Sequence, residues 1–494
     1  MSVAILPTNF LRRQAKMFGS LRPSDFFGMR VLVMGLGLHG GGLSVARWFL
    51  ANGATVLVTD LKTRAQLQAS ISRLQKTRRL SFALGGHRHA DFRWADVVVQ
   101  NPGVPRESPY LAIARRAKAV IENEATLFFK LVGRERIVGV TGTRGKSTTA
   151  ALAAAVLKTM YPKTILAGNI ATVPMFAVVD RVLRSRAPVV LELSSWHLEN
   201  LGEQHVSPHV AVVTNVMPDH LNRYRSIVAY AAAKRQIVAH QGEGDLAVLN
   251  WDNPWTKKFA ASCRGTVVAY SATRQRKVPT AYADRALYWF DGHRRTRVAS
   301  FGDWQIPGAH NLSNILAAIA VGELFGVPHG VIRKALRSFS GLPYREQVVA
   351  QANRVRYVND TTATTPEATT AALRTFGTGL GKNERRIVLV AGGSDKGLPQ
   401  ESFAALAKAI RKYCKAVVLF CGRGSERIIS ELERGMAVRP VVSNLQTMAQ
   451  AVTAAKSFAQ PGDTVLLSPA CASFGLFVHE FDRGDQFNRC IKKV

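Results

Sequence analysis

The chain has 494 residues, of which 47% are hydrophobic and 20% charged, a composition typical of a folded globular protein and not of a disordered one. Its 66 Lys and Arg residues against 33 Asp and Glu give a formal net charge of +33. The basic residues are spread along the whole chain without an aromatic-plus-basic motif, so the charge does not by itself indicate nucleic-acid binding. A positive field would equally attract a small anionic substrate.

The sequence predicts neither a membrane protein nor a secreted one. No apolar run reaches the roughly 18 residues needed to span a bilayer. Residues 1–29 carry arginines but no uninterrupted apolar core, so we expect a basic leader and not a signal peptide. The five cysteines are scattered, without the spacing of a zinc site or an even disulfide count. A cytoplasmic location follows from these features.

The first region alternates strand and helix patterns. β-Branched runs at residues 30–37, 54–60 and 95–105 predict strands, and residues 43–53 have helical spacing with a glycine stop. This alternation is typical of a doubly wound parallel sheet. The glycine cluster "GLGLHGGG" at 35–42 lies between the first strand and the helix. It suits a diphosphate site or simply a tight connection.

Two further regions repeat this pattern. The second opens at Glu135 with a buried strand, continues through strand patterns at 188–199, 208–224 and 245–253, and includes a helix at 310–326. The third alternates through "RRIVLVAGGSDKG", "KAVVLFCGRG" and "DTVLLSPACAS". We therefore predict three α/β domains, over residues 30–134, 135–340 and 341–494, after the leader at 1–29.

The segment "TGTRGKST" at 141–148 has the parts of a phosphate loop. It follows a predicted strand and precedes an Ala-rich helix, and it combines glycines with a lysine and hydroxyls. Val140 stands where the strict Walker pattern places its first glycine, which indicates a different subtype of loop. Lys146 is expected to reach the β- and γ-phosphates, and Ser147 to ligate Mg²⁺.

Nine segments in this order resemble the Mur ligase family, the ATP-dependent amide ligases of peptidoglycan precursor assembly. They are "GVTGTRGKSTT", "LELSSWHLE", "NVMPDHLNRY", "AAAKRQI", "HNLSNILAA", "GLPYREQ", "VNDTTATTPEA", "GGSDKG" and "LSPACASFGLFVHEFDRG". The resemblance implies a Rossmann-like N-terminal domain for the UDP-sugar, a central P-loop ATPase-like domain and a Rossmann-like C-terminal domain for the amino acid. It implies UDP-N-acetylmuramoyl-L-alanine and D-glutamate as substrates, ATP and Mg²⁺ as cofactors, and an acyl-phosphate intermediate. We also expect a monomer.

The resemblance also assigns site residues. The catalytic and metal-binding group would be Lys146, Ser147, Glu192, His220 and Lys234, the last as a metal ligand if it is carbamylated. The ATP-binding group would be Gly142, Thr143, Gly145, Lys146, Ser147, Thr148, Asn311, Asn314, Arg345 and Asp360. The UDP-sugar would contact Gly35, Leu38, His39 and Asn169, and the amino acid Thr364, Lys396, Ser473 and Phe474.

This chain departs from the family pattern in three places. Thr362 in "NDTTAT" stands where the D-glutamate branch usually has a lysine, which removes one cation from the predicted amino-acid site. The glycine cluster around His39 is longer than usual, and the basic leader is unusual.

Several alternatives stay open at this stage. A related ligase could use L-glutamate, a folyl-polyglutamate or a pseudopeptidoglycan precursor. A nucleic-acid-stimulated ATPase would account for the net charge. An NAD-dependent oxidoreductase would use the glycine cluster but would leave the phosphate loop without a role.

Overall fold

The computed structural model describes residues 19–38, 40–105, 107–170, 173–219, 221–274, 277–377, 384–435 and 440–492. Two predicted site residues, His39 and His220, lie outside the described residues. The chain divides into two compact units, one of Met1–Trp304 with Leu312–Phe339 and the other of Gln305–Asn311 with Ser340–Val494. In the described part of the chain, no helix is both long and apolar enough to cross a membrane.

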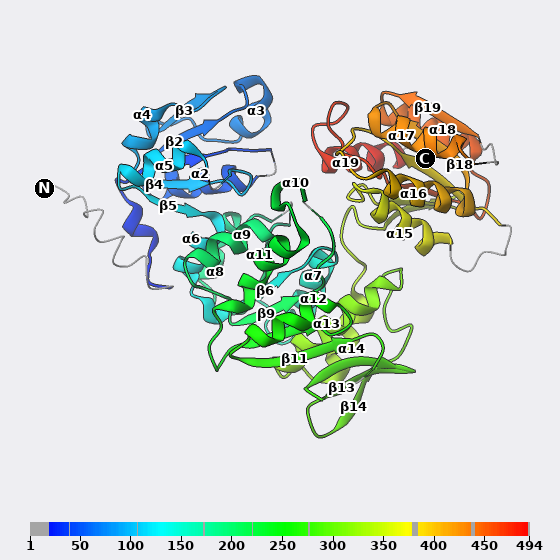
Figure 1. The fold of residues 1–494 in the computed structure, drawn as a ribbon, viewed down its shortest axis with the longest axis horizontal. Helices are drawn as coiled ribbons and strands as arrows, with labels where there is room; N and C mark the ends of the chain where they lie inside the picture. The colour runs from blue at the N-terminus through cyan, green and yellow to red at the C-terminus, as the bar shows by residue number, and fades with distance from the viewer. Residues whose placement is uncertain are drawn as a thin grey trace, which may run out of the picture. The chain divides into compact units, whose positions relative to one another are not determined.

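The first unit begins with a five-stranded parallel sheet of order β3-β2-β1-β4-β5 (Figure 1). Its strands are β1 Arg30–Met34, β2 Thr55–Asp60, β3 Leu80–Leu84, β4 Val97–Gln100 and β5 Val120–Asn123. Its helices are η1 Pro23–Phe26, α2 Gly41–Ala51, α3 Arg64–Ile71, α4 His89–Trp94, α5 Pro109–Arg116, α6 Glu124–Val132 and η2 Arg134–Arg136. Central strands such as β4 are buried on both faces and mostly apolar, as expected for a parallel sheet between helices.

The same unit continues into a nine-stranded sheet of order β14-β13-β12-β11-β10-β9-β6-β8-β7. Its strands are β6 Ile137–Thr141, β7 Ile165–Gly168, β8 Val189–Glu192, β9 Val210–Val213, β10 Leu246–Asn250, β11 Thr266–Ser271, β12 Thr280–Asp284, β13 Ala286–Phe290 and β14 Arg295–Ala299. Its helices are α7 Lys146–Lys158, η3 Met175–Ala177, α8 Val179–Leu183, α9 Ser195–Glu203, α10 Leu221–Tyr224, α11 Ile227–Ala239, α12 Pro254–Phe259, η4 Ala260–Ser262, α13 His310–Leu324 and α14 His329–Ser338.

Strand β13 pairs antiparallel with both β12 and β14, whereas the other pairs of this sheet are parallel. Between β12 and β13 there is only Arg285, in the left-handed region with φ 57°. A connection this short permits only antiparallel pairing, because a parallel crossover needs a dozen or more residues.

The second unit contains a six-stranded sheet of order β15-β16-β20-β17-β18-β19, in which only the edge pair β15–β16 is antiparallel. Its strands are β15 Gln347–Ala352, β16 Val355–Asn359, β17 Ile387–Ala391, β18 Cys414–Phe420, β19 Val441–Leu445 and β20 Thr464–Leu467. Its helices are α15 Pro366–Gly377, α16 Gln400–Tyr413, α17 Arg423–Glu433, α18 Met448–Phe458 and α19 Glu480–Ile491. Separate hydrophobic clusters fill the two faces of this sheet.

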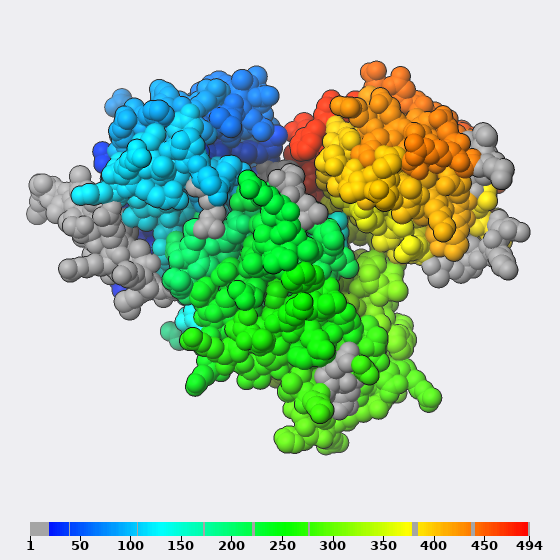
Figure 2. Space-filling view, in the orientation of Figure 1, coloured from blue at the N-terminus to red at the C-terminus, as the bar shows by residue number. Residues whose placement is uncertain are grey.

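The two sheets of the first unit are joined by direct packing. Helix α2 packs against η3 and helix α6 against α9, and one hydrophobic cluster includes residues from both sheets. The indole N–H of Trp48 donates a hydrogen bond of 2.9 Å to Asp180, and the buried Lys130–Glu122 ion pair is joined by Gln204 at 3.1 Å. Figure 2 shows the blue-to-cyan and green surfaces of this unit in contact.

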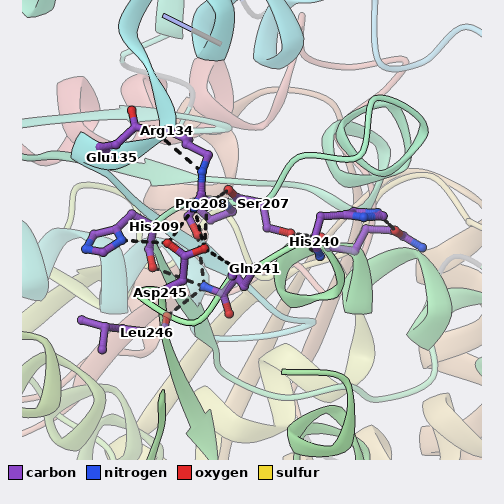
Figure 3. A network of polar contacts seen from close by, with 11 residues as sticks. Arg134, Glu135, Ser207, Pro208, His209, His240, Gln241, Asp245 and Leu246 are labelled. Atoms are coloured by element: carbon purple, nitrogen blue, oxygen red, sulfur yellow. Dashed lines mark hydrogen bonds and ion pairs between the residues drawn. The ribbon is translucent and has the colours of Figure 1, made fainter. Parts of the chain in front are cut away.

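A polar network ties the segment before β6 to the segments before β9 and β10 (Figure 3). Arg134 donates hydrogen bonds from Nη1 at 2.8 Å and from Nη2 at 2.6 Å to Oδ2 of Asp245. Oδ1 of Asp245 lies 2.8 Å from Nδ1 of His209. Gln241 donates to three backbone carbonyls in the same place, those of Pro208, His209 and Leu246. Because His209 and Asp245 precede β9 and β10, the network lies at the amino edge of the sheet, away from the phosphate loop.

Candidate active site

The predicted phosphate loop connects β6 to α7 at the carboxyl edge of the nine-stranded sheet. Gly142 has φ 147°, and a Cβ there would lie 1.8 Å from Oγ1 of Thr214. Gly145 has φ 80°, and a Cβ there would lie 2.4 Å from Oδ1 of Asn314. Both positions therefore require glycine. Val140 is a fully buried β6 residue paired with Glu192 on β8, so the chain is still a strand where the strict pattern has its first glycine.

The segment after β9 holds the backbone of this loop. Thr143 N donates to the carbonyl of Asn215 at 2.8 Å, and Arg144 N donates to the Asn215 side-chain oxygen at 2.9 Å. The Thr214 hydroxyl donates to the carbonyl of Arg144 at 2.6 Å. These bonds fix the loop conformation before any ligand binds, which lowers the conformational cost of binding.

Two lysines converge on the loop. Lys146 Nζ donates to the carbonyl of Thr143 at 3.0 Å, and Lys234 Nζ, from α11, donates to the carbonyl of Gly142 at 2.7 Å. Lys234 is 1% exposed, and burial, followed by the charge of Lys146, lowers its pKa well below its usual value. An amine in this state is unprotonated and nucleophilic more often than an ordinary lysine.

Glu192 ends β8 beside the loop and is buried. Its Oε1 accepts a hydrogen bond of 3.4 Å from Asn169, while its buried Oε2 accepts none from any described residue. A buried carboxylate oxygen left without a donor is a costly arrangement that a bound cation would relieve. Ser147, the neighbouring hydroxyl at the start of α7, is also buried. These groups fit a metal ion, although the described residues contain no cluster of three or more His, Cys, Asp or Glu side chains.

The remaining predicted ATP contacts of the first unit lie nearby. Asn314, on α13, accepts a hydrogen bond of 3.1 Å from Thr149, which follows Thr148 in the first turn of α7. Asn311 belongs to the second unit, where its side-chain amide donates to the carbonyl of Pro307. The structure thus brings Asn314 to the phosphate loop. For Asn311 it shows the hydrogen bond to Pro307 within the second unit.

The N-terminal sheet has a separate cavity of ≈ 530 Å³ at its carboxyl edge. The cavity is lined by Gly35, Gly37, Asp60, Lys62, His87 and Asn101, among others. Asp60 accepts hydrogen bonds from the backbone N–H groups of Leu36 at 2.9 Å and Gly37 at 3.2 Å. Of the predicted UDP-sugar residues, Gly35 lines this cavity and Leu38 packs against the core beside it, whereas Asn169 lies with Glu192.

Sequence reasoning overlooked Asp60, His87 and Asn101 as pocket residues. Asp60 did carry a signal, since it ends a predicted strand two positions before a lysine. His87 and Asn101 come from other segments of the sheet and meet Asp60 only in three dimensions. Oγ1 of Thr59 and Nδ1 of His87 lie 2.7 Å apart, and burial lowers the pKa of this histidine.

In the second unit the predicted amino-acid residues come together at the carboxyl edge of β16, β17 and β20. Lys396 Nζ donates a hydrogen bond of 2.8 Å to the hydroxyl of Thr364. Two hydrogen bonds of 3.1 Å between Ser394 and Ala472 tie the Lys396 loop to the segment that carries Ser473 and Phe474. Ser473 is buried, whereas Phe474 is 64% exposed. The hydroxyl of Thr362 donates to the carbonyl of Tyr344 at 3.0 Å.

Arg345 and Asp360 lie next to this group in the same unit. Asp360 accepts hydrogen bonds from the Ser468 hydroxyl at 2.8 Å and from Glu346 N at 3.2 Å. Burial raises the pKa of Asp360 to about 7. Arg345 stands between Tyr344 and Glu346, which have φ values of 66° and 45°. Two left-handed non-glycine residues on either side of one side chain store strain, as is frequent at functional sites.

Comparison with known proteins gives consistent matches along the chain. Residues 29–122 match the Mur ligase MurD-like N-terminal domain, residues 140–322 the Mur ligase middle domain, and residues 344–471 the Mur ligase glutamate ligase domain. The chain is 44% identical to the UDP-N-acetylmuramoylalanine–D-glutamate ligase of Roseiflexus sp. (strain RS-1), over 94% of this chain and 98% of that protein. It is 35% identical to the enzyme of the same name from Symbiobacterium thermophilum, with the same two coverages.

Solved structures share the fold at lower identity. The UDP-N-acetylmuramate–alanine ligase of Thermotoga maritima matches with a TM-score of 0.63 at 21% identity, over 94% of this chain and 99% of that one. The MurF ligase of Thermotoga maritima, in complex with ADP, matches with a TM-score of 0.55 at 18% identity, over 97% and 99%.

Fold and loop together define an α/β protein of the class that binds nucleotide phosphates at the carboxyl edge of a parallel sheet. Within that class, the chain belongs to the Mur ligase family of ATP-dependent amino-acid ligases. The predicted family and the three-domain α/β fold are confirmed.

Proposed function

We propose that this protein joins D-glutamate to UDP-N-acetylmuramoyl-L-alanine at the expense of ATP, in peptidoglycan precursor synthesis. The observation that carries the proposal is the group of Lys146, Lys234 and Glu192 on a prearranged phosphate loop. This group lies in a chain that matches relatives of that name over 94% of its length.

The chemistry begins with the carboxylate of the UDP-sugar substrate. One of its oxygens attacks the γ-phosphorus of ATP, and ADP leaves with the electron pair of the broken P–O bond. Lys146 binds phosphate oxygens, and the N–H groups in the first turn of α7 hold the nucleotide in line. The amine of D-glutamate then attacks the acyl phosphate, and phosphate leaves from a tetrahedral intermediate.

Mg²⁺ held by Glu192 and Ser147, with His220 and a carbamylated Lys234, would neutralise the phosphate charge. Glu192 suits this role because its second oxygen is buried without a donor among the described residues. Lys234 suits carbamylation because a buried amine with a lowered pKa attacks CO₂ readily. As a carbamate it would become an anion beside Lys146, which removes the repulsion between the two side chains.

The other sites follow from the same proposal. The N-terminal cavity beside Gly35 and Leu38 takes the UDP group, with His39 and Asn169 as further contacts of the UDP-sugar. Asn311, Asn314, Arg345 and Asp360 complete the ATP site. Lys396, Thr364, Ser473 and Phe474 bind D-glutamate, since ammonium and hydroxyl donors suit its two carboxylates.

The proposal also includes a division of the chain into domains. A basic leader at residues 1–29 precedes a UDP-sugar domain at 30–134, an ATP domain at 135–340 and an amino-acid domain at 341–494. The protein acts as a monomer in the cytoplasm and supports cell-wall biogenesis, cell shape and cell division. It requires no nucleic acid.

One observation favours a second candidate, a Mur-type ligase with another amino acid or acceptor. Thr362 replaces a cation of the usual D-glutamate pattern, and its hydroxyl is engaged with Tyr344. The deciding experiment measures ADP release with UDP-N-acetylmuramoyl-L-alanine against a panel of D- and L-amino acids. Turnover that depends on D-glutamate supports the first proposal, and preference for another amino acid overturns it in favour of the second.

A further inference from the structure

Arg144 lies in the middle of the phosphate loop, and none of the roles derived above uses its side chain. Its backbone is fixed on both sides, since its N–H donates to Oδ1 of Asn215 at 2.9 Å and its carbonyl accepts from Thr214 at 2.6 Å. The side chain is 43% exposed. Arg144 is thus a half-exposed cation on a stretch of main chain that is held by hydrogen bonds.

The guanidinium of Arg144 forms an ion pair with Asp219, with Nη1 and Oδ2 3.2 Å apart and side chains 43% and 21% exposed. An ion pair this exposed contributes little to stability. A phosphate group offers more negative charge and a better geometric match to the planar guanidinium fork than one carboxylate does. A phosphate group can therefore compete with Asp219 for the guanidinium.

The surroundings of Arg144 are those of the reacting groups. After burial and Lys146, its charge is among the causes that lower the pKa of Lys234, and it also acts on the hydroxyl of Tyr230. Its backbone N–H binds Asn215, after β9, and Lys234 donates to the carbonyl of Gly142, two residues before Arg144. An arginine keeps its charge even beside other cations, which a buried lysine does not.

We propose that Arg144 is a catalytic residue for phosphoryl transfer, which releases Asp219 and binds the equatorial oxygens of the γ-phosphoryl group. In this step the substrate carboxylate forms a bond to the γ-phosphorus, and the bond from that phosphorus to the bridging oxygen breaks, with its electrons left on ADP. The charge of Arg144 stabilises the transferring group while neither bond is complete. The inference rests on the proposed function only in its use of ATP and a carboxylate acceptor.

The test compares Arg144→Ala, Arg144→Lys and Asp219→Asn in the full chain. Arg337→Ala is the matched control, because Arg337 forms a similar exposed ion pair with Asp303 at 2.6 Å, beyond β14 at the far edge of the sheet. ADP formation in a single turnover should fall at least about 10²-fold in Arg144→Ala and less in Arg144→Lys. Asp219→Asn and Arg337→Ala should stay within about threefold of the parent, because exposed pairs contribute little.

A binding measurement separates phosphate recognition from loop anchoring. Calorimetry with ADP alone should give the same affinity for the parent and Arg144→Ala. Calorimetry with ADP plus aluminium fluoride, which imitates the transferring phosphoryl group, should show at least about a tenfold loss in the variant. If Arg144→Ala does not fold, Arg144→Gln is measured in its place.

Two results would overturn the inference. Equal losses in Arg144→Ala, Asp219→Asn and their double variant would mean that the ion pair only anchors the loop after β9. Equal affinities of the parent and Arg144→Ala for ADP with aluminium fluoride would remove the phosphate contact. Failure of the proposed function appears separately, as absence of D-glutamate-dependent ADP release by the parent protein.

Discussion

The first unit contains two glycine-rich loops that join a parallel strand to a helix, and their amide groups have different partners. In the N-terminal loop, the N–H groups of Leu36 and Gly37 already donate to the carboxylate of Asp60. In the central loop, the N–H groups of Thr143 and Arg144 donate to neutral Asn215. Glycines occur in both turns, whereas the partners of the loop amides differ in charge, with Asp60 at one loop and Asn215 at the other.

This difference bears on the alternative of an NAD-dependent oxidoreductase. A dinucleotide-binding turn presents its amides to a diphosphate. At the N-terminal loop the amides of Leu36 and Gly37 are instead engaged by the carboxylate of Asp60, so they are not available to a diphosphate. The central loop faces Lys146 and Lys234 and so attracts phosphate.

The strongest test of the central loop removes its cation or the carboxylate beside it. Lys146→Ala and Glu192→Ala should each lower ATP-dependent ligation by at least about 10³-fold, since charge stabilisation of the transferring group is lost. Circular dichroism of both variants should match the parent, because neither side chain belongs to the hydrophobic core. Near-normal turnover in either folded variant would contradict the assignment of the loop.

The role of Lys234 gives the next largest effect. Lys234→Ala should lose about 10²-fold or more in activity, and formate or acetate should restore part of it by replacing the carbamate, whereas chloride should not. Absence of rescue, together with an unmodified lysine in a crystal structure, would mean that the amine acts without CO₂.

The buried amine of Lys234 also predicts a pH dependence of stability. In CO₂-free buffer the unfolded chain keeps this lysine protonated up to about pH 10.5, while its lowered pKa leaves the folded form neutral over part of that range. The unfolded state then binds more protons, so the free energy of unfolding rises with pH. Denaturant titrations between about pH 7 and 10 should show this rise in the parent and a shallower one in Lys234→Met. Identical slopes would refute the lowered pKa.

A substitution of Asp60, which binds the amides of the N-terminal loop, tests the role of that loop. Asp60→Ala removes two charge-assisted hydrogen bonds, each contributing about 1.5–3 kcal/mol. It should raise the KM of the UDP-sugar by about 10- to 100-fold and leave the KM of ATP nearly unchanged. Asp96→Asn is the matched control, because Asp96 accepts from Arg30 N at 2.9 Å at the amino edge of the same sheet. A rise in the KM of ATP as large as that for the UDP-sugar would show that the two loops do not act separately.

A substitution in the second unit tests whether amino-acid binding is independent of both loops. Lys396→Ala should raise the KM of glutamate by about one to two orders of magnitude, through one charge-assisted hydrogen bond. The KM of ATP should change far less. Lys415→Met is the control, since its ion pair with Asp463 at 2.8 Å lies at the amino edge of the same sheet. Equal weakening of ATP and glutamate by Lys396→Ala would mean that the pocket is misplaced.

Thr362→Lys should have the smallest effect. It restores a cation near Lys396 but loses the hydrogen bond to Tyr344, so the KM of glutamate should fall or change by less than about threefold, the scale of one neutral hydrogen bond. A large loss of glutamate binding would show that the Thr362 hydroxyl, and not a missing charge, shapes the site.

Local patterns predicted the elements that carry the chemistry. The strand patterns at 30–37 and 54–60 correspond to β1 and β2, and the helix at 310–326 corresponds to α13. The phosphate loop was predictable because glycine, lysine and hydroxyls occupy fixed offsets between a strand and a helix. The N-terminal cavity was not, because Asp60, His87 and Asn101 are distant in sequence and become neighbours only through parallel strand pairing.

By itself, therefore, the sequence determined the three α/β domains, the phosphate loop and the family, since each depends on residue order and short-range spacing. Only the tertiary structure decided the partners of the described site residues and the lowered pKa of Lys234. Packing of α11 against the loop buries Lys234 and lowers its pKa. Pairing of β2 with β1 places Asp60 on the N-terminal loop. Desolvation and pairing depend on what folding brings together, and residue order alone does not contain that information.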